Sequence, residues 1–542
     1  MKRIYQITLL SLSLLIVSSC DDGFDELNKS KTGATAVDPI TAFNNAVIFC
    51  SPPAGTLVYE LGAVQQIITS NSGVNVGANY NQVNIGSTPA NWTNSFQNTI
   101  KYCSDAMANT KEDPTRANLY NMARIVQQYA FMVLTDTYGA IPYSEAGKGY
   151  TEGIFLPVYD TPESIYDGII SELTAASAAL DPAGKVETSD VLYKGEIAKW
   201  KKFANSLLLR AGMRLVNANP SKAAATVAAA FSAGVILDNA DNAVIRHDAN
   251  FMNGVGNTLN GTEAANFYLT KTFVDALKAN NDPRLDSAIA VRYVGANSGP
   301  AQVYTGGSAN AKFNSANQYG MPMGSTDATA DAAGAALPGG GNRYAFSQAN
   351  RNVVASRATP MFLVTAAMSN LLLSEAVERN IAGVTGTSEN YFKAGITAHM
   401  AQMSSYAITS VTPNPTIKPA DIAAYVNARA ATFNAAPAGA ALADSRVNEI
   451  NYEYWIASFL NGNECWANFR RVGMEQRSYR TPNPAAAAQL FFSNPYSGKV
   501  VDWINRITYP PSESLVNTEN YNAAVSAMGG KDELGVKLFW AQ

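Results

Sequence analysis

Apolar residues recur every three or four positions along much of this chain, a spacing that predicts amphipathic helices. The clearest apolar face runs from Trp92 to Met107. The same spacing predicts helices over about 115–137, 162–180 and 196–216. Turn and capping residues separate them, as in solenoids built from helix pairs, although the breaks do not define a strict repeat length. Thr161 is a favourable N-cap, and Pro162 suits the first position of the helix that follows it.

The helical pattern is interrupted between Gly295 and Asn342, where charged residues almost disappear. Only Lys312, Asp327 and Asp331 are charged there, among many Gly, Ala, Ser, Asn and Thr residues. A segment of this composition has little to bury, and long loops of this kind are either functional or disordered. We therefore expect a loop that takes part in ligand binding.

Helical periodicity returns near Thr359. Three more helices are expected, over about 387–408, 420–434 and 448–470. From Thr481 onward, repeated prolines predict mostly coil, followed by a short helix near 519–527.

The first residues have the features of a secretory signal. Lys2 and Arg3 precede a short apolar run that ends at Val17, and small residues then lead to Cys20. The run of about eleven residues is too short to cross a bilayer as a helix. A cysteine after Val-Ser-Ser resembles a bacterial lipobox, in which Cys20 becomes lipidated once residues 1–19 are removed. The alternative is a plain secretory signal with an incidental cysteine.

The segment after Cys20 is short, polar and acidic. Asp21 and Asp22 resemble the acidic export signal of surface lipoproteins in Bacteroidetes. Residues 20–35 are therefore expected to be a flexible lipidated tether on the outer membrane, with the folded domain over 36–542. In the lipobox resemblance, Cys20 receives two acyl chains on its sulfur and a third on its new amino group. Three chains, at about 0.8 kcal/mol per buried methylene, make a durable anchor.

The composition indicates a polar but nearly neutral surface. Hydrophobic residues make up 47% of the chain and charged residues 15%, below the roughly 25% usual for soluble domains. Loss of Lys2 and Arg3 with the signal peptide changes the net charge from −4 to −6. This balance, without a basic stripe that carries interleaved aromatics, argues against nucleic acid as a partner.

The remaining cysteines, Cys50, Cys103 and Cys465, are odd in number and have no Cys-x-x-Cys spacing. A disulfide framework or a zinc site is therefore not expected. Buried free thiols are the simplest interpretation. A single bridge between Cys50 and Cys103 is the alternative.

No catalytic motif stands out. His247 and His399 lack metal-binding spacing, and neither a nucleophile elbow nor a phosphate-binding loop is present. Glu449 and Glu453 lie one helical turn apart and resemble a paired-carboxylate site, but a solvated helix face is the simpler interpretation. We expect a protein that is not an enzyme and needs no cofactor. A glycoside hydrolase is the enzymatic alternative, and a purely structural surface protein is the third.

Several sequence blocks together carry a family resemblance. The most specific is Trp200–Arg210, and the closing blocks Gly462–Arg471 and Tyr509–Glu513 follow in the expected order. Others are Leu134–Ala146, Pro157–Thr161, Ile165–Tyr166, Asn280–Arg284, Leu373–Ala376 and Glu519–Tyr521. With them the chain resembles the SusD/RagB family of nutrient-binding outer-membrane lipoproteins, in its SusD-like branch. It departs from the pattern at Cys465 and in Ala-rich inserts near 328–336 and 435–443.

The resemblance implies one mainly α-helical domain, in which tetratricopeptide-like helix pairs form a scaffold and a loop-rich half is inserted and wrapped around it. The scaffold would span about 36–235 and 359–434, and the ligand half about 236–358 and 435–542. Such proteins cover a SusC-like TonB-dependent barrel at the cell surface and capture oligosaccharide or oligopeptide, without catalysis.

Two loops carry groups suited to ligand recognition. Sugars need flat aromatic faces for their C–H surfaces and amide or carboxyl groups for their hydroxyls, whereas peptides need amides that pair with an extended backbone. The candidate residues are Asn75, Tyr80, Asn81 and Trp92 in the first loop, and Tyr304, Phe313 and Tyr319 in the second. Trp92 begins an apolar helical face, which favours a core position for it. Glycan is the preferred ligand class and peptide the alternative.

Overall fold

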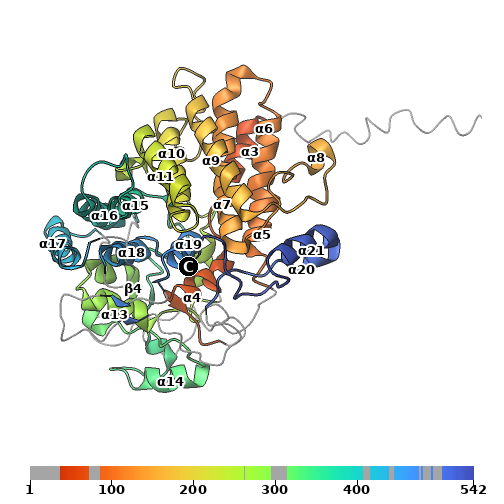
Figure 1. Cartoon of the computed structure of the whole chain (residues 1–542). Helices are drawn as coiled ribbons and strands as arrows, with labels where there is room; N and C mark the ends of the chain where they lie inside the picture. The colour runs from red at the N-terminus through yellow and green to blue at the C-terminus, as the bar shows by residue number, and fades with distance from the viewer. Residues whose placement is uncertain are drawn as a thin grey trace, which may run out of the picture.

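The chain folds mainly into α-helices with a few very short strands (Figure 1). The computed structural model describes residues 37–71, 86–261, 263–293, 314–406, 416–438, 445–474 and 503–541, and the backbone of 478–479 and 490–491. The predicted signal peptide, Cys20 and tether lie outside these residues.

Most helices of the N-terminal part form a stacked bundle in the upper half of Figure 1. The helices of this part are α3 (Pro39–Ile48), α4 (Glu60–Ala63), which lies below the bundle, α5 (Ala90–Asn94), α6 (Lys101–Ala108), α7 (Ala117–Tyr138), α8 (Gly149–Glu152), α9 (Pro162–Ala179), α10 (Ile197–Arg214) and α11 (Pro220–Ala233). A π-helical segment, η2 (Ser95–Ile100), joins α5 to α6. Helix α7 packs against α6 and α9, and α10 packs against α9 and α11. This pairwise packing agrees with the helix-pair scaffold that the sequence predicts.

Local capping residues set the ends of these helices. The Thr161 hydroxyl accepts a hydrogen bond from the backbone N–H of Ser164, and Pro162 is the first residue of α9, as expected. Helix α7 ends at Gly139, whose φ of +89° favours glycine. The apolar faces lie inward, and Trp200 of α10 is completely buried.

The C-terminal part contributes a second group of helices. They are α15 (Ala366–Glu378), α16 (Ser388–Gln402), α17 (Pro419–Ala435), α18 (Arg446–Ala457), α19 (Gly462–Arg471), α20 (Pro511–Val516) and α21 (Thr518–Ala527). Helix α15 packs against α16, α18 and α10, and so joins this group to the N-terminal bundle. The single helix predicted over 448–470 is wrong. The chain breaks at Leu460, which has a φ of +65°, and Asn461 caps the new helix α19.

The strands form four two-stranded antiparallel ladders. They pair β1 (Ile67–Ile68) with β3 (Tyr268–Leu269), β2 (Ala243–Ile245) with β6 (Met361–Val364), β4 (Ala290–Val291) with β5 (Gln348–Ala349), and β7 (Ser478–Tyr479) with β8 (Leu490–Phe491). The β2–β6 pair brings together the two ends of the segment between them. Residues 246–360 therefore leave the bundle and return to it at one place.

The inserted segment contains α12 (Gly254–Leu259), α13 (Lys271–Ala279) and α14 (Asp327–Ala335). The last of these was not expected, because the uncharged stretch 295–342 has the composition of a loop. Thr326 caps α14 in a capping box, and Ala330 reaches a small separate core with Tyr268 and Phe346. Local capping and a few distant apolar partners thus order part of this stretch.

The sequence predicts that Glu449 and Glu453 lie on a solvated helix face, and this prediction is wrong. The two residues do not form an open pair of carboxylates either. Both side chains are at most 1% exposed. Glu449 accepts a hydrogen bond from Arg429, while Glu453 accepts from both Arg429 and Arg284. The two glutamates belong to a buried ion cluster, because arginines from other elements reach α18.

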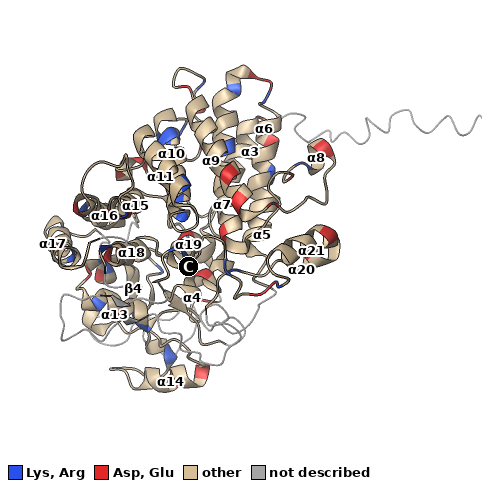
Figure 2. Ribbon diagram, viewed as in Figure 1, with Lys and Arg blue, Asp and Glu red and all other residues tan. Residues whose placement is uncertain are grey.

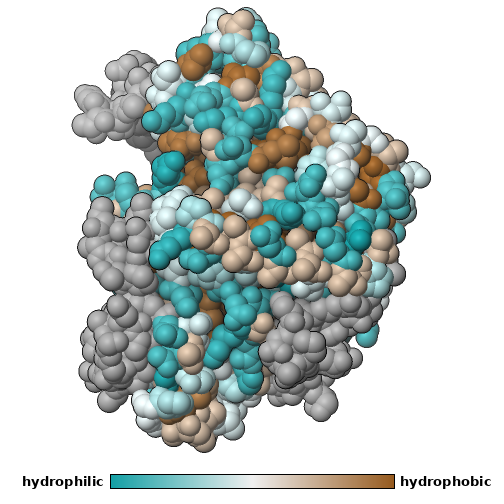
Figure 3. All heavy atoms as spheres, turned by 90° about the vertical axis from the view of Figure 1, so that its left-hand side faces the viewer, coloured by the Kyte–Doolittle hydropathy of each residue, from teal (hydrophilic) through white to brown (hydrophobic). Residues whose placement is uncertain are grey.

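The three thiols within the described residues, Cys50, Cys103 and Cys465, are free and buried, which confirms the simplest interpretation. Burial raises the pKa of all three thiols, so they stay protonated. Charged residues are sparse on the ribbon, and Lys and Arg occur among Asp and Glu rather than in a continuous basic stripe (Figure 2). The face that carries α16 and α17 mixes polar and apolar residues (Figure 3).

Candidate ligand-binding groove

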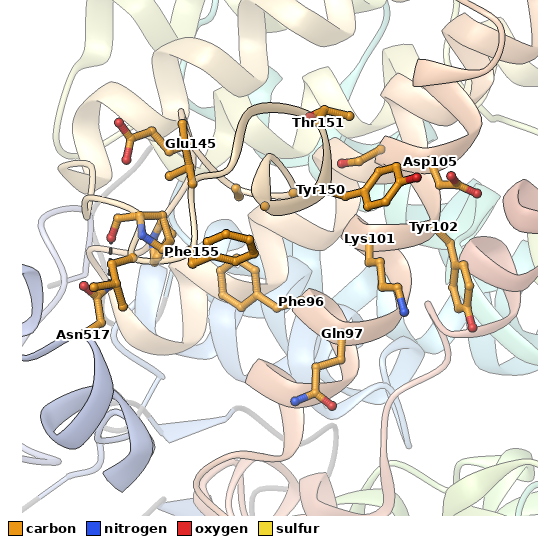
Figure 4. Close-up of a pocket in the computed structure, with 18 of the residues that line it drawn as sticks. Phe96, Gln97, Lys101, Tyr102, Asp105, Glu145, Tyr150, Thr151, Phe155 and Asn517 are labelled. Carbon is orange, nitrogen blue, oxygen red and sulfur yellow. Dashed lines mark hydrogen bonds between the residues drawn. The ribbon is translucent and has the colours of Figure 1, made fainter. Parts of the chain in front are cut away.

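A groove of about 890 Å³ lies on the side of the helical bundle that faces α8 and α20. Helices α5 and α6 with η2 form one wall, the loop 142–157 forms the other, and α20 contributes to one end. Figure 4 shows Phe96, Gln97 and Lys101 on the helical wall, with Tyr150 and Phe155 on the loop. The volume falls within the roughly 300–1,000 Å³ typical of small-molecule sites.

The loop that forms the outer wall is shaped by glycines and by one closing hydrogen bond. Gly147 and Gly153 flank α8 with φ values of +75° and +71°, a backbone conformation that other residues rarely adopt. The Glu145 carboxylate accepts a hydrogen bond from the backbone N–H of Val158 at 2.9 Å. At Gly147 the loop also approaches α6 so closely that a Cβ atom there would lie 2.2 Å from the Ser104 hydroxyl oxygen.

Aromatic rings form the floor of the groove. Trp92 is 8% exposed and lies in a cluster with ring centroids 4.8 Å from Phe96, 5.2 Å from Tyr138, 6.0 Å from Tyr159 and 5.8 Å from Tyr509. Most of its indole therefore packs in the core, as the sequence favoured. The remaining edge and the neighbouring Phe96 line the groove.

The rim of the groove carries exposed apolar side chains. Tyr150 is 100% exposed, Phe155 79%, Val516 67% and Leu156 53%. Contiguous exposed apolar groups of this kind mark interaction sites, whereas single ones are common on any surface. Two free aromatic faces above an aromatic floor provide surfaces on which a flat ligand can stack.

Amide groups complement the aromatic surfaces. Asn517 donates to the backbone carbonyl of Pro157 at 2.8 Å and so fastens the end of the loop to the segment between α20 and α21. Asn109 donates to the backbone carbonyl of Asp105 at 2.8 Å. The Gln97 amide has no hydrogen bond to any other described residue, so both its donors and its acceptor are available to a ligand.

The carboxyl group of Glu513 lies at the end of the groove to which α20 contributes. Glu513 accepts a hydrogen bond of 2.7 Å from the Tyr159 hydroxyl. Partial burial raises the pKa of Glu513 above its ordinary value, although hydrogen bonds from Tyr159 and Trp92 oppose the shift. These partners fix the orientation of the carboxyl group beside the aromatic floor.

A second cavity of about 580 Å³ lies between the end of α13 and α17. Burial raises the pKa of Asp286, which lines it, to about 6. Among the described residues that line it, Tyr425 supplies the one aromatic ring, and its hydroxyl already donates a hydrogen bond to Glu453 in the buried ion cluster. This cavity therefore offers a ligand no free aromatic face.

Two of the predicted ligand-binding residues, Trp92 and Tyr319, lie within the described part of the chain. Trp92 lines the groove, mostly by one edge. Tyr319 does not line it. Its ring lies beneath the cations of Lys278 and Arg292, with centroid distances of 5.0 and 4.9 Å, beside the small core under α14. Cys20, Asn75, Tyr80, Asn81, Tyr304 and Phe313 lie outside the described residues.

The sequence reasoning missed Tyr150 and Phe155. Their signal was present, since both lie in a short glycine-punctuated segment that is too brief to build a core. Aromatic residues in such a segment have no interior to enter. The groove itself could not be found from the sequence, because its walls come from three distant parts of the chain.

Two further features of the described residues concern metal binding and membrane spanning. Within the described segments, no group of three or more His, Cys, Asp or Glu side chains is arranged to hold a metal ion. None of the helices in the described part of the chain is both long enough and apolar enough to span a membrane.

Comparison with known proteins identifies the family. Residues 56–490 match the SusD-like family described as starch-binding and associating with the outer membrane. This chain belongs to that family. Among curated proteins, none matches it.

Solved structures agree with this assignment. A chitin-binding protein is 27% identical to this SusD-like chain, with a TM-score of 0.74 over 93% of this chain and all of its own. A Bacteroidetes AC2a SusD-like structure is 24% identical, with a TM-score of 0.73 over 93% of this chain and all of its own. A chitin-binding SusD homologue from Flavobacterium johnsoniae is 20% identical, with a TM-score of 0.67 over 93% and 98%. The mainly helical, tetratricopeptide-like fold is therefore confirmed.

Proposed function

We propose that this SusD-like protein captures oligosaccharides at the bacterial surface and delivers them to a SusC-like TonB-dependent transporter, without catalysing a reaction. The observation that carries the proposal is the open groove whose rim presents Tyr150 and Phe155. Their exposed rings can stack on the C–H faces of sugar rings, and the free Gln97 amide can bind hydroxyl groups. The chitin-binding relative, at 27% identity, supports glycan as the ligand class.

Capture at the cell surface leads to uptake only if a channel accepts the ligand. The match to a family described as associating with the outer membrane supports this setting. We propose that Cys20 carries a lipid anchor and that a transporter barrel accepts the captured glycan. A tether over 20–35 would hold the protein near the barrel at a high effective concentration while allowing it to open.

Isothermal titration with a panel of chitin-derived and starch-derived oligosaccharides tests glycan capture. We expect Tyr150→Ala combined with Phe155→Ala to weaken binding about tenfold, because each lost stacking surface contributes about 0.5–1.5 kcal/mol. Both side chains are exposed, so the double variant should keep the helical circular dichroism of the parent. Tyr391→Ala on α16 removes an aromatic ring far from the groove and should leave the affinity unchanged.

If the double variant and its parent bind oligosaccharides with equal affinity, the groove is not the binding site. Binding of oligopeptides in place of oligosaccharides would favour the peptide alternative. The transporter is tested by purification of the tagged protein from outer membranes in mild detergent. A co-purifying barrel protein is the expected result, and recovery of the protein alone, with glycan uptake unaffected by its deletion, would contradict the delivery step.

A further inference from the structure

The groove contains more negative than positive charge. Asp105, Glu145 and Glu513 line it, and Lys101 is the one cation among the described residues that line it. Figure 4 shows Glu145 near one end of the groove, with Lys101 and Asp105 near the other. A ligand that lies along the groove therefore meets carboxyl groups at both ends.

These three carboxyl groups have no cationic partner within the described part of the chain. Asp105 accepts only from Asn109, at 3.2 Å, and Glu145 accepts from the backbone N–H of Val158. Glu513 accepts from neutral groups. The ammonium of Lys101 lies 5.5 Å above the ring of Tyr102 and forms no ion pair with Asp105, although one helical turn separates the two residues.

Two buried carboxylates, in contrast, form ion pairs with arginine. Glu464 pairs with both Arg210 and Arg214, at 3.2 and 2.9 Å. Glu375 pairs with Arg471 at 2.7 Å. Arginine thus compensates these two buried carboxylates, whereas no arginine or lysine within the described residues pairs with the three carboxyl groups of the groove.

Carboxyl groups beside exposed aromatic faces suit a particular ligand chemistry. A carboxylate attracts an ammonium group, and the face of an aromatic ring does the same through its quadrupole. The Tyr150 and Phe155 rings and the three carboxyl groups act on the same space. Anionic sugars would instead be repelled by Asp105, Glu145 and Glu513.

We propose that the groove selects oligosaccharides that carry free amino groups, such as oligomers of glucosamine, over neutral and acidic oligosaccharides. The inference rests on the proposed function of glycan capture in this groove. Sugar rings would stack on Tyr150 and Phe155, while their ammonium groups meet Asp105, Glu145 and Glu513. The Gln97 amide remains available to form hydrogen bonds with the hydroxyl groups of the sugar.

Glucosamine and N-acetylglucosamine oligomers of equal length test the inference, because they differ only in the charge and acetylation of the amino group. We expect the glucosamine oligomer to bind about fivefold more tightly in titration calorimetry at low salt, and the difference to shrink at high salt. Oligogalacturonate of the same length should bind least.

A triple variant assigns the preference to the groove. Asp105→Asn with Glu145→Gln and Glu513→Gln keeps the acceptor oxygens for Val158 and Tyr159 but removes the charge. We expect it to bind both oligomers equally. Glu389→Gln on α16, an exposed carboxylate on another face, makes the same change of charge and should leave the fivefold preference intact.

Each outcome has a distinct meaning. Equal or weaker binding of the glucosamine oligomer, or an unchanged preference in the triple variant, overturns the inference while glycan capture stands. Binding of lysine-rich peptides in preference to every oligosaccharide overturns both. Absence of binding to any oligosaccharide refutes the proposed function itself, and with it the inference.

Discussion

The buried carboxylate of Glu453 provides a demanding test of how this fold is held together. Glu453 on α18 is 1% exposed and accepts hydrogen bonds from Arg284 at 2.8 Å, Arg429 at 2.8 Å and Tyr425 at 2.9 Å. Burial alone would raise the pKa of Glu453, but the two arginines hold it below its ordinary value. The side chain is therefore charged at neutral pH and joins α17, α18 and the turn after α13.

The variant Glu453→Gln removes this charge while keeping the shape of the side chain. Breaking a buried ion pair costs about 3–5 kcal/mol when it leaves a charge without compensation. In the variant, Arg284 still has its ion pair with Asp282, at 2.6 Å, and Arg429 still has its ion pair with Glu449, at 2.7 Å. We therefore expect the low end, a loss of about 3 kcal/mol in the free energy of unfolding, which is about a hundredfold in the folded-to-unfolded ratio.

Urea denaturation followed by far-ultraviolet circular dichroism measures the loss, with the slope of the transition as a check that the unfolding reaction is the same. Glu389→Gln is the matched control. Glu389 forms an exposed pair with Lys393 at 3.6 Å, and its loss should cost less than about 0.5 kcal/mol. If Glu453→Gln costs less than about 1 kcal/mol at an unchanged slope, the buried cluster does not stabilise the fold as argued.

Two further predictions concern protonation and the anchor. Burial raises the pKa of Glu60 to about 7, although Arg470 and Asn91 oppose the shift. The protonated form thus favours folding, so stability should fall as pH rises from about 4.5 to 7. Glu60→Gln mimics the protonated form, so it should become more stable relative to the parent as pH rises through this window. Melting of both proteins at pH 5 and pH 8 tests this. An equal difference in melting temperature at the two pH values would contradict the assignment. Cys20→Ala should abolish partitioning with outer-membrane vesicles, and normal retention of that variant would exclude the proposed lipid anchor.

Features encoded within a few neighbouring residues could be predicted from the sequence. The periodic apolar face of α10 and the Thr161–Pro162 start of α9 depend on residues within one or two helical turns. The family resemblance also rested on short blocks such as Trp200–Arg210, and the match over 56–490 confirms it. Trp92 was placed correctly as a mainly core residue, because it begins an apolar helical face.

Features that depend on distant partners could not be predicted in this way. Glu449 and Glu453 look solvated in the sequence, because helical spacing shows only which residues share a face and not what packs against that face. Arg284 lies far along the chain, and only the fold brings it to α18. The break at Leu460 and the ordering of α14 likewise depend on tertiary contacts that local composition does not show.

The sequence by itself determined the long N-terminal helices, the cap of α9 and the family, since these follow from local periodicity and from short motifs. Only the tertiary structure decided the groove. Its floor at Trp92, its outer wall at Tyr150 and Phe155, and its end at Glu513 are far apart in the chain. A binding site depends on where side chains converge in space, and that convergence is set by the packing of helices rather than by the sequence of any one of them.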